Sequence, residues 1–340
     1  MKSTLTFIAA ALMMVACSKA PVIPQIIFDT DQGNDVDDVL ALDLLNKFID
    51  EGKVDVLAIT LNKEGRGPVE FVDIMQTFYG HPDIPIGKIT DGHFDPNDTS
   101  VNYAQVVADM KDGAGEPLFA RSDTDPDSRP ESYLLYRKAL AAAKDNSVTI
   151  ASVGFFTNLK RLYESPADEF SPLTGRELIS KKVRELVVVA GVFSNPELHE
   201  FNVYVDIPSA KTILEEWPTP IVVSPWELGI NVLYPGANID TDHAWAGHHP
   251  LAEAYKCYLP MPYDRPMWDD TAVLFAAGEE DWFTISPYGN IEVTPEGSTL
   301  FKEDPDGTRR YLSVTSEQAA ALRDYLVARI ARKPACYNEQ

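Results

Sequence analysis

The sequence predicts an α/β fold, in which a single domain with insertions builds a mostly parallel open sheet flanked by helices. Along most of the 340 residues, hydrophobic runs of strand length alternate with runs whose apolar residues recur at helical spacing. The strand-like runs are rich in Val and Ile and almost continuously apolar, which is typical of parallel strands covered on both faces. The sequence contains no internal repeat or linker, so one compact domain is expected.

The first half of the chain supplies the first elements of this alternation. Gln25 to Asp31 (QIIFDTD) reads as a buried strand, and a helix is predicted from about Asp37 through Asp50. A second strand, Val54 to Thr60, leads to a helix over Val69 to Tyr79, and a third helix is predicted at Ser132 to Ala143. Strands that are each followed by a helix favour parallel pairing, because parallel strands need a long crossover.

The second half continues in the same manner. Strands are predicted at Ser147 to Gly154, Val183 to Gly191 and Pro220 to Ser224, with a helix at Ser209 to Trp217 between the last two. The final helix is expected to begin after a capping box, in which Thr315 and Gln318 exchange side-chain hydrogen bonds with each other's backbone.

Two stretches break the alternation and are predicted to be insertions. Residues 91–130 are rich in Asp, Gly, Ser and Pro, which favours a long irregular excursion. Residues 238–266 contain three of the six histidines, His243, His248 and His249, together with several aromatic residues. A solvated loop and a catalytic segment both fit this composition.

The charge balance restricts the class of ligand. The chain has 52 acidic and 29 basic residues, for a net charge of −23. Such a surface repels nucleic acid and anionic lipid, so neither is expected as a partner. A small neutral molecule or a cation suits this charge better.

The first residues resemble an export signal. Lys2 precedes an apolar run, Leu5 to Ala16, and small residues stand directly before Cys17. We expect residues 1–20 to be a lipoprotein signal and tether, cleaved before a lipidated Cys17, and residues 21–340 to be the catalytic domain. This predicts a location in the bacterial cell envelope, on the periplasmic or surface side; a plain secretory signal, giving a secreted protein, is the alternative. The apolar run is too short to span a bilayer.

An acidic cluster follows the first predicted strand. The stretch IIFDTDQGNDVDDVL contains five aspartates, and neighbouring carboxylates repel one another unless a positive charge neutralises them. In parallel sheets, ligands bind beyond the carboxyl ends of strands, which is where Asp29 and Asp31 are expected. Gly33 permits a tight turn, and Asp37 and Asp38 open the next helix. Oxygen ligands of this density favour a hard cation such as Ca²⁺ over zinc.

Two other acid-rich patterns share features with this stretch. An EF-hand requires glycine at loop position six, and counting from Asp29 gives Asn34, so that pattern fails. A strand that ends in DxD also resembles phosphotransferases of the haloacid-dehalogenase type, which would use Asp29 as the nucleophile.

Five motifs in order resemble the nucleoside hydrolases, the inosine-uridine-preferring family. The first, DTDQGNDVDDVLAL, is similar to the family's DTDxGxDDAxAL with a two-residue insertion between Gly33 and Asp37. The others are Asn62 after the second strand, VGFFTNL at 153–159, HEFNVYVDIPSA at 199–210 and WDDTAVLFA at 268–276. Together they span about three-quarters of the chain.

The resemblance implies calcium-dependent hydrolysis of the N-glycosidic bond of ribonucleosides to free base and ribose. It assigns metal ligation to Asp31, Asp38, Asp269 and the main-chain carbonyl of Thr157, with Asp31 also the general base. The ribose site that it implies consists of Asp37, Asn62, Glu200 and Asn202. A dimer or tetramer is also what the resemblance implies.

Several of these residues have simpler structural interpretations. Asn62 could cap a turn, and Thr157 could be an ordinary helix N-cap. Glu200 and Asn202 are expected to alternate along an extended segment and so to point to one side. Asp206 is expected to start a helix and not to bind a ligand.

Two departures from the family pattern leave the base preference open. Trp268 stands where the family has a histidine, and a tryptophan can stack on a base but cannot protonate it. The family's MGG segment reads Val189, Ala190, Gly191 here. A leaving-group acid would then come from the 238–266 insertion, where His243, His248 and Tyr255 are the candidates. A noncatalytic nucleoside- or sugar-binding lipoprotein on the same scaffold is the alternative function.

Overall fold

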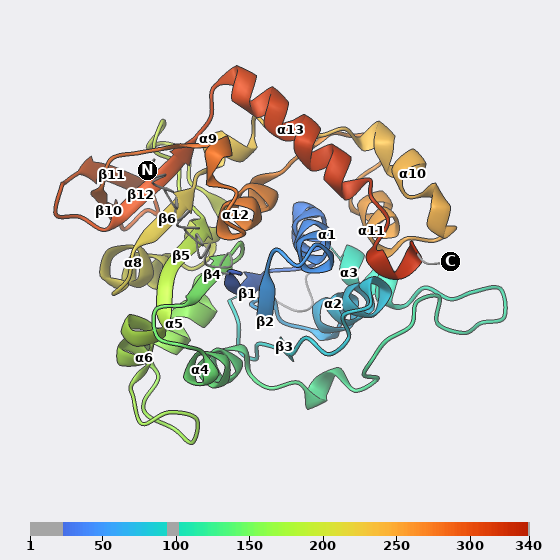
Figure 1. The fold of residues 1–340 in the computed structure, drawn as a ribbon, viewed down its shortest axis with the longest axis horizontal. Helices are drawn as coiled ribbons and strands as arrows, with labels where there is room; N and C mark the ends of the chain where they lie inside the picture. The colour runs from blue at the N-terminus through green and yellow to red at the C-terminus, as the bar shows by residue number, and fades with distance from the viewer. Residues whose placement is uncertain (1–22, 94–101, 339–340) are drawn as a thin grey trace, which may run out of the picture.

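The computed structural model describes residues 23–93 and 102–338 and shows a central sheet with helices on both faces (Figure 1). Ten strands form this sheet, in the order β11-β10-β12-β6-β5-β4-β1-β2-β3, with β9 paired to β12. The seven strands from β12 to β3 are parallel, and β9, β10 and β11 are antiparallel additions at one end. The predicted fold class, an α/β domain with a mostly parallel sheet, is confirmed.

The parallel strands are β1 (Gln25–Thr30), β2 (Asp55–Leu61), β3 (Ile86–Gly87), β4 (Val148–Ser152), β5 (Val183–Val189), β6 (Ile221–Ser224) and β12 (Arg309–Ser313). The antiparallel end consists of β9 (Thr284–Ile285), β10 (Gly289–Val293) and β11 (Thr299–Glu303), and β7 (Leu233–Tyr234) pairs separately with β8 (Arg265–Pro266). Strand β1 lies between β2 and β4, and every residue from Ile26 to Thr30 is fully buried. The continuous apolar pattern of that run therefore reflects cover on both faces.

Two groups of helices cover the two faces. One face carries α1 (Asp37–Asp50), α2 (Arg66–Tyr79), α3 (Tyr103–Ala108), α11 (Pro250–Tyr258), α12 (Trp268–Ala276) and α13 (Ser316–Ile330). The other carries α4 (Ser132–Ala142), α5 (Thr157–Glu164), α6 (Gly175–Lys182) and α8 (Ile207–Glu216). The short helices α7 (Phe201–Val205), α9 (Trp226–Gly229) and α10 (Ile239–Asp242) lie in connections.

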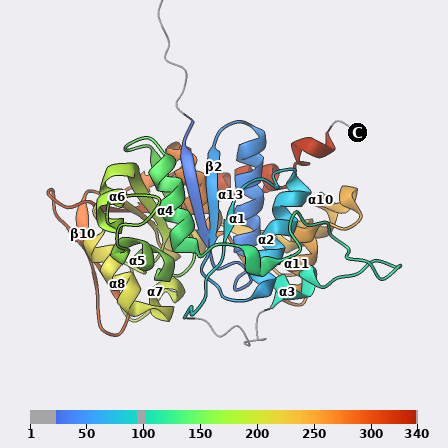
Figure 2. The same ribbon diagram turned by 90° about the horizontal axis from the view of Figure 1, so that it is seen from below.

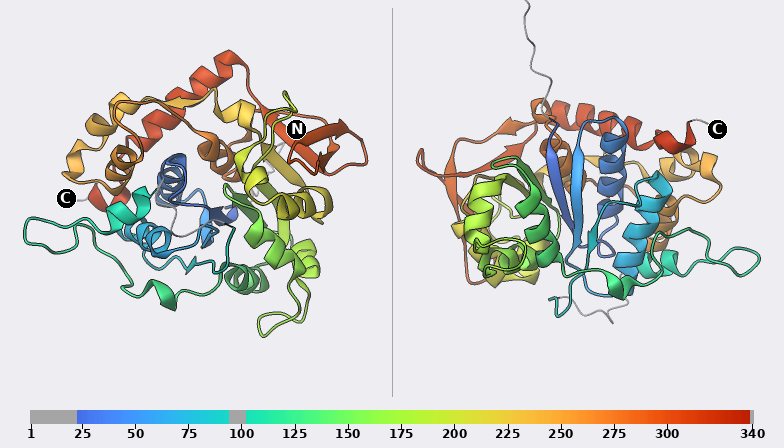
Figure 3. Two further views of the ribbon diagram at one scale, coloured as in Figure 1. Left: turned by 180° about the vertical axis from the view of Figure 1, so that it is seen from behind. Right: turned by 60° about the horizontal axis from the view of Figure 1, so that its bottom comes forward.

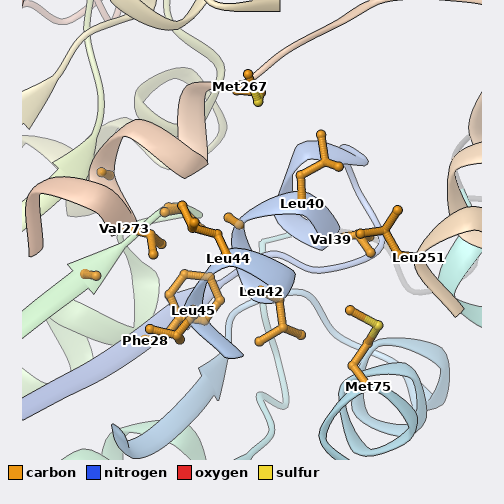
Figure 4. Packing of buried hydrophobic residues seen from close by; sticks show 14 of the residues in the cluster. Phe28, Val39, Leu40, Leu42, Leu44, Leu45, Met75, Leu251, Met267 and Val273 are labelled. Atoms are coloured by element: carbon orange, nitrogen blue, oxygen red, sulfur yellow. The ribbon is translucent and has the colours of Figure 1, made fainter. Parts of the chain in front are cut away.

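Helix α1 is enclosed along most of its length. Its side chains are buried from Asp37 through Phe48, so it has no solvent-facing side along most of its length. Figure 4 shows Leu44 and Leu45 beside Val273 of α12 and Phe28 of β1, while Leu42 faces Met75 of α2. Because neighbouring elements surround α1, the acidic residues in its first turn are held in place by the whole hydrophobic core.

The 238–266 insertion is structured. Helix α11 packs against α1, α2 and α3. Helix α13 packs on α1 and runs from the antiparallel end of the sheet toward this insertion (Figure 3). The predicted final helix is confirmed together with its capping box, Thr315 and Gln318. The antiparallel strands β10 and β11 were not predicted.

The ends of the parallel strands define two ends of the molecule. The chain enters β1 at one end, and α3 and α7 lie toward the opposite, carboxyl end (Figure 2). The expected signal with Cys17 falls outside the described residues. Of the helices in the described part of the chain, none is both long and apolar enough to span a membrane.

Candidate active site

A cavity of about 630 Å³ lies beyond the carboxyl ends of β1, β4 and β5. This position is the usual ligand site of a parallel α/β sheet. The cavity is lined by six carboxylic acids, by five aromatic or imidazole rings and by one arginine. The lining residues are Asp31, Asn34, Asp35, Asp37, Asp38, Val153, Val189, His199, Glu200, Phe201, Asn202, Trp226, Tyr258, Arg265, Trp268 and Asp269.

The turn between β1 and α1 brings three of these acids together. Gly33 has φ +101°, a conformation that favours glycine, and lets the chain reverse between Asp31 and the helix. The Gly33 amide donates to the Tyr103 hydroxyl at 2.8 Å, and its carbonyl accepts from Lys63 Nζ at 2.7 Å. Asp37 and Asp38 then form the first turn of α1, as predicted.

The fourth acid, Asp269, comes from the first turn of α12. Its backbone amide donates to Asp37 Oδ2 at 3.3 Å. One ligand-type oxygen from each of Asp37, Asp38 and Asp269 lies within 4.8 Å of the others, and all three residues are buried. Asp38 accepts a short hydrogen bond from the Thr30 hydroxyl through Oδ1, while its buried Oδ2 has no hydrogen-bond partner in the described structure. An orphaned carboxylate oxygen in an all-oxygen cluster fits a hard cation.

Burial and mutual repulsion disturb the titration of these acids. Burial raises the pKa of Asp31 from 3.8 to about 7, with the nearby Glu200 charge adding to the shift and Lys63 opposing it. The pKa values of Asp37, Asp38 and Asp269 are raised well above the usual range by burial first and by neighbouring aspartates second. These buried carboxyl groups therefore hold their protons more tightly than exposed carboxyl groups do.

Asp29 is a structural anchor beneath the cavity. Its carboxylate accepts hydrogen bonds from Thr60 at 2.8 Å, Asn62 at 2.5 Å, Ser152 at 3.1 Å and Asn158 at 3.1 Å, and it is fully buried. Burial raises its pKa to about 6, although the four donors lower it. Because both oxygens are occupied and the residue does not line the cavity, Asp29 is not placed to act as a phosphotransferase nucleophile.

Asn62 takes part in this anchor and not in the cavity wall. It bonds Asp29, accepts from the Phe155 amide at 3.0 Å and donates to the Phe155 carbonyl at 3.1 Å. The structure thus does not place Asn62 where it contacts a ligand in the cavity, contrary to its predicted role in the ribose site. Its position ties the end of β2 to the loop before α5.

Thr157 is the first residue of α5, and Phe156 occupies the N-cap position, so the N-cap interpretation of Thr157 is wrong. The Thr157 hydroxyl donates to Asp206 Oδ2 at 2.6 Å. Asp206 in turn caps α8 by accepting from the Ser209 amide at 3.2 Å, which confirms it as a helix-start acid. The Thr157 side chain is therefore committed to holding α5 against α8 and does not line the cavity.

Glu200 and Asn202 both line the cavity, but the predicted extended segment is wrong. Glu200 is the N-cap of α7 and accepts from the Asn202 amide at 2.8 Å and the Val203 amide at 3.0 Å. This capping bends the chain into a helix, so the two side chains are brought together by a helical turn. Asn202 donates to the Val153 carbonyl at 2.8 Å, and burial raises the pKa of Glu200 to about 7.

The remaining wall is aromatic with one cation. Trp268 donates from Nε1 to the Trp226 carbonyl at 2.8 Å, which fixes its ring in the wall. The Arg265 guanidinium lies 5.0 Å from the Tyr258 ring centre and 5.4 Å from that of Trp268, and it forms an ion pair with Asp35. Asp35 belongs to the two-residue insertion of the first motif.

Sequence reasoning missed Arg265, Tyr258 and His199 as cavity residues. Two of them stood within or near recognised motifs: His199 is the first residue of the 199–210 motif, and Arg265 lies four residues before Asp269. Proximity in sequence to a motif was the available signal. That proximity does not indicate which side chains face the cavity.

The predicted leaving-group acids lie elsewhere. His243 is buried with Nδ1 3.1 Å from the Ile239 carbonyl, and His248 lines a separate cavity beside Phe78. The Tyr255 hydroxyl donates to the Tyr263 carbonyl at 2.8 Å. None of these three residues lines the active-site cavity, because the part of the insertion that carries them packs against α1 and α2. Tyr258 and Arg265 are the residues of the insertion that reach the cavity wall. The prediction is corrected accordingly.

Comparisons with known proteins agree with this fold. The family model described as inosine-uridine preferring nucleoside hydrolase matches residues 26–323. Among solved structures, a plant nucleoside hydrolase has a TM-score of 0.67 at 19% identity, covering 92% of this chain and 100% of its own. An inosine-uridine preferring nucleoside hydrolase from Bacillus anthracis has a TM-score of 0.66 at 16% identity, with coverages of 90% and 99%.

A purine-preferring ribonucleoside hydrolase from Gardnerella vaginalis has a TM-score of 0.64 at 17% identity, covering 90% of this chain and 98% of its own. At these identities the structural likeness shows the fold alone. The search of curated proteins found no match.

The raised pKa values predict how calcium stabilisation depends on pH. Without metal, the folded chain binds more protons than the unfolded chain between the usual value of 3.8 and about 7, so stability falls as pH rises through this window. A bound cation needs the deprotonated ligands and removes that cost. We expect the rise in Tm on adding calcium to chelator-treated protein to be larger at about pH 8 than at about pH 5. Differential scanning fluorimetry measures this, and an equal rise at both pH values would contradict the account.

Proposed function

Because the chain belongs to the family of inosine-uridine preferring nucleoside hydrolases, and is thereby a hydrolase of N-glycosyl bonds, we propose that it cleaves ribonucleosides to free base and ribose in a calcium-dependent reaction. One observation carries the proposal: the aspartates of the family's first and last motifs, Asp31, Asp37, Asp38 and Asp269, line a single cavity. Two chain segments more than two hundred residues apart thus contribute to one acidic site.

We assign the cation to carboxylate oxygens of Asp31, Asp38 and Asp269, which all line the cavity. Thr157, whose main-chain carbonyl the resemblance implies as a further ligand, does not line the cavity and is left out of this assignment. Carboxylate oxygens are hard donors, which suit calcium. When bound, calcium would supply positive charge that neutralises the cluster, binds sugar hydroxyls and makes a nearby water more acidic. Asp37, whose Oδ2 already accepts from the Asp269 amide, is assigned to a ribose hydroxyl at the edge of the same cluster.

Asp31 is the proposed general base. As the water oxygen forms a bond to C1′, the C1′–N bond breaks and its electron pair leaves with the nucleobase. One proton of the water passes to Asp31. Burial raises the pKa of Asp31 to about 7, and a base of that pKa accepts a proton effectively near neutral pH. The ribosyl group becomes positively charged during this step, and the carboxylates around it stabilise that charge.

Glu200 and Asn202 are positioned by their own hydrogen bonds before substrate enters. The Glu200 carboxylate is held by amides of the first turn of α7, and Asn202 is held by the carbonyl of Val153. Side chains locked in this manner lose little conformational freedom on binding. They form the part of the cavity that is proposed to recognise sugar hydroxyls.

The direct test of the function uses purified protein, calcium and a panel of nucleosides. We expect release of free base and ribose, and loss of release in chelator. Asp31→Asn should lower kcat on every substrate by about a hundredfold or more, because it removes the proton acceptor but keeps the size of the side chain. Binding without turnover by the wild-type protein would instead identify a noncatalytic nucleoside-binding protein, the alternative function.

Arg265 is proposed to stabilise the departing base. It is the only lysine or arginine among the described residues of the cavity wall, and its buried Nε has no hydrogen-bond partner in the described structure. The Tyr258 and Trp268 rings beside it offer faces on which a base can stack. A guanidinium N–H that bonds a base nitrogen or carbonyl oxygen stabilises the electron pair that the base receives.

Arg265→Gln should therefore lower kcat/KM for natural nucleosides by about a hundredfold, the typical effect of losing one such donor. The same variant should lose little on a 4-nitrophenyl riboside, whose leaving group is already stable as an anion. Asp35→Asn is the matched control, because it removes the partner of Arg265 and keeps the guanidinium. An equal loss on both substrates would show that Arg265 acts only on the structure of the wall.

A further inference from the structure

A second cluster of metal-ligating side chains lies outside the active-site cavity. Asp43 of α1, His243 after α10 and His249 at the N-cap of α11 each offer one ligand atom, and these atoms lie within 4.8 Å of one another. The exposed fractions of the three residues are 0%, 4% and 2%. Two of the residues, His243 and His249, belong to the histidine-rich 238–266 insertion, and the proposed reaction uses neither of them.

Each of these three residues has one buried polar atom whose hydrogen-bonding capacity is not used. Asp43 Oδ2, His243 Nε2 and His249 Nε2 are all buried, and none has a hydrogen-bond partner in the described part of the chain. A buried polar atom without a partner is costly, so three such atoms in one small cluster call for a ligand or a shared proton.

Other polar atoms of the cluster form hydrogen bonds with neighbouring residues outside the cluster. His243 Nδ1 lies 3.1 Å from the Ile239 carbonyl, which favours a proton on Nδ1 and a lone pair on Nε2. Asp43 Oδ1 accepts a short hydrogen bond from the Tyr79 hydroxyl. A histidine whose far nitrogen donates to a backbone carbonyl is the usual support for a metal ligand.

An aromatic shell surrounds the histidines. The His249 ring lies 4.4 Å from that of His243, 4.6 Å from Phe78, 5.4 Å from Trp245 and 6.0 Å from Tyr79. Such a shell excludes water and strengthens charge interactions inside it.

Charges of both signs lie around the cluster, and Lys47 and Lys256 both act electrostatically on His243. Lys47 Nζ lies 3.5 Å from Asp43 Oδ1 and also donates to the Arg332 carbonyl, so the ammonium faces the oxygen that is already occupied. Asp50 and the fully buried Asp270 act electrostatically on Asp43 or are acted on by it.

We propose that Asp43, His243 and His249 form a structural site for a divalent first-row transition metal such as Zn²⁺. Two imidazole nitrogens and one carboxylate oxygen are a donor set that suits zinc and not calcium. The metal would tie the 238–266 insertion to α1, the helix whose first turn carries Asp37 and Asp38.

Binding changes one existing contact. In the structure, His249 Nδ1 accepts from the Leu251 amide at 3.3 Å, an arrangement that places the ring proton on Nε2. Coordination through Nε2 moves that proton to Nδ1 and gives up this long contact. The site therefore exchanges a weak cap of α11 for a bond from the metal to the His249 ring.

The test uses the full protein, purified without chelator, with elemental analysis in the presence of excess Ca²⁺ to saturate the oxygen-rich cluster. We expect about one equivalent of a first-row metal per chain, retained on dialysis. After metal removal, Co²⁺ added with excess Ca²⁺ should bind at one equivalent and give the visible absorption of a nitrogen- and oxygen-ligated ion. Added Zn²⁺ should raise the Tm and displace the cobalt signal.

His249→Ala should lose both the retained metal and the rise in Tm with Zn²⁺, while His248→Ala, which changes the adjacent exposed histidine, should keep both. Asp43→Asn is a second variant, because it preserves the size of the side chain should His249→Ala fail to fold. If wild-type protein retains no first-row metal and shows neither a cobalt spectrum nor a Zn²⁺-dependent rise in Tm, the three residues share protons only and the proposal is overturned. This outcome is independent of whether the protein hydrolyses nucleosides.

Discussion

The repulsion among buried carboxylates at the carboxyl end of the sheet is the constraint on which the site depends. Asp31, Asp37, Asp38, Asp269 and Glu200 line one cavity, and each is almost fully buried. Charged groups are costly in such surroundings unless positive charge or hydrogen-bond donors meet them. The architecture meets part of this cost by directing the first turns of α1, α7 and α12 to the cavity, where helix N-termini carry partial positive charge. A bound cation would meet the rest.

A second layer of polar residues holds the acidic layer in place. Asp29 joins β1 to β2, to β4 and to α5 through four side-chain donors, and Asn62 extends this connection to the backbone of Phe155. This layer explains why the first aspartate of the motif is needed although it does not face the cavity. It converts the ends of three strands into one rigid platform, and a rigid platform is what precise positioning of Asp31 requires.

The sequence was sufficient to predict those elements for which the hydrophobic pattern and a family motif indicate the same structure. Helix Asp37–Asp50 and the central strand were predicted almost to the residue, because α1 and β1 are buried and their apolar pattern reflects the core directly. The gathering of Asp31, Asp37, Asp38 and Asp269 also followed from the motifs. Other elements depend on contacts that the hydrophobic pattern does not reveal. The Glu200 side chain accepts hydrogen bonds from two backbone amides, and these bonds stabilise a helix in a segment that was expected to be extended. The insertion packs on α1, a long-range contact without a sequence signal, and so removes His243 from the reaction.

The most direct test of the central claim is a crystal structure of the protein grown with calcium and free ribose. The account predicts one cation at about 2.3–2.6 Å from oxygens of Asp31, Asp38 and Asp269, the usual range for calcium. It also predicts the sugar hydroxyls beside Asp37, and C1′ facing Asp31. A structure in which these carboxylates pair with one another through shared protons, with no cation between them under saturating calcium, would contradict it.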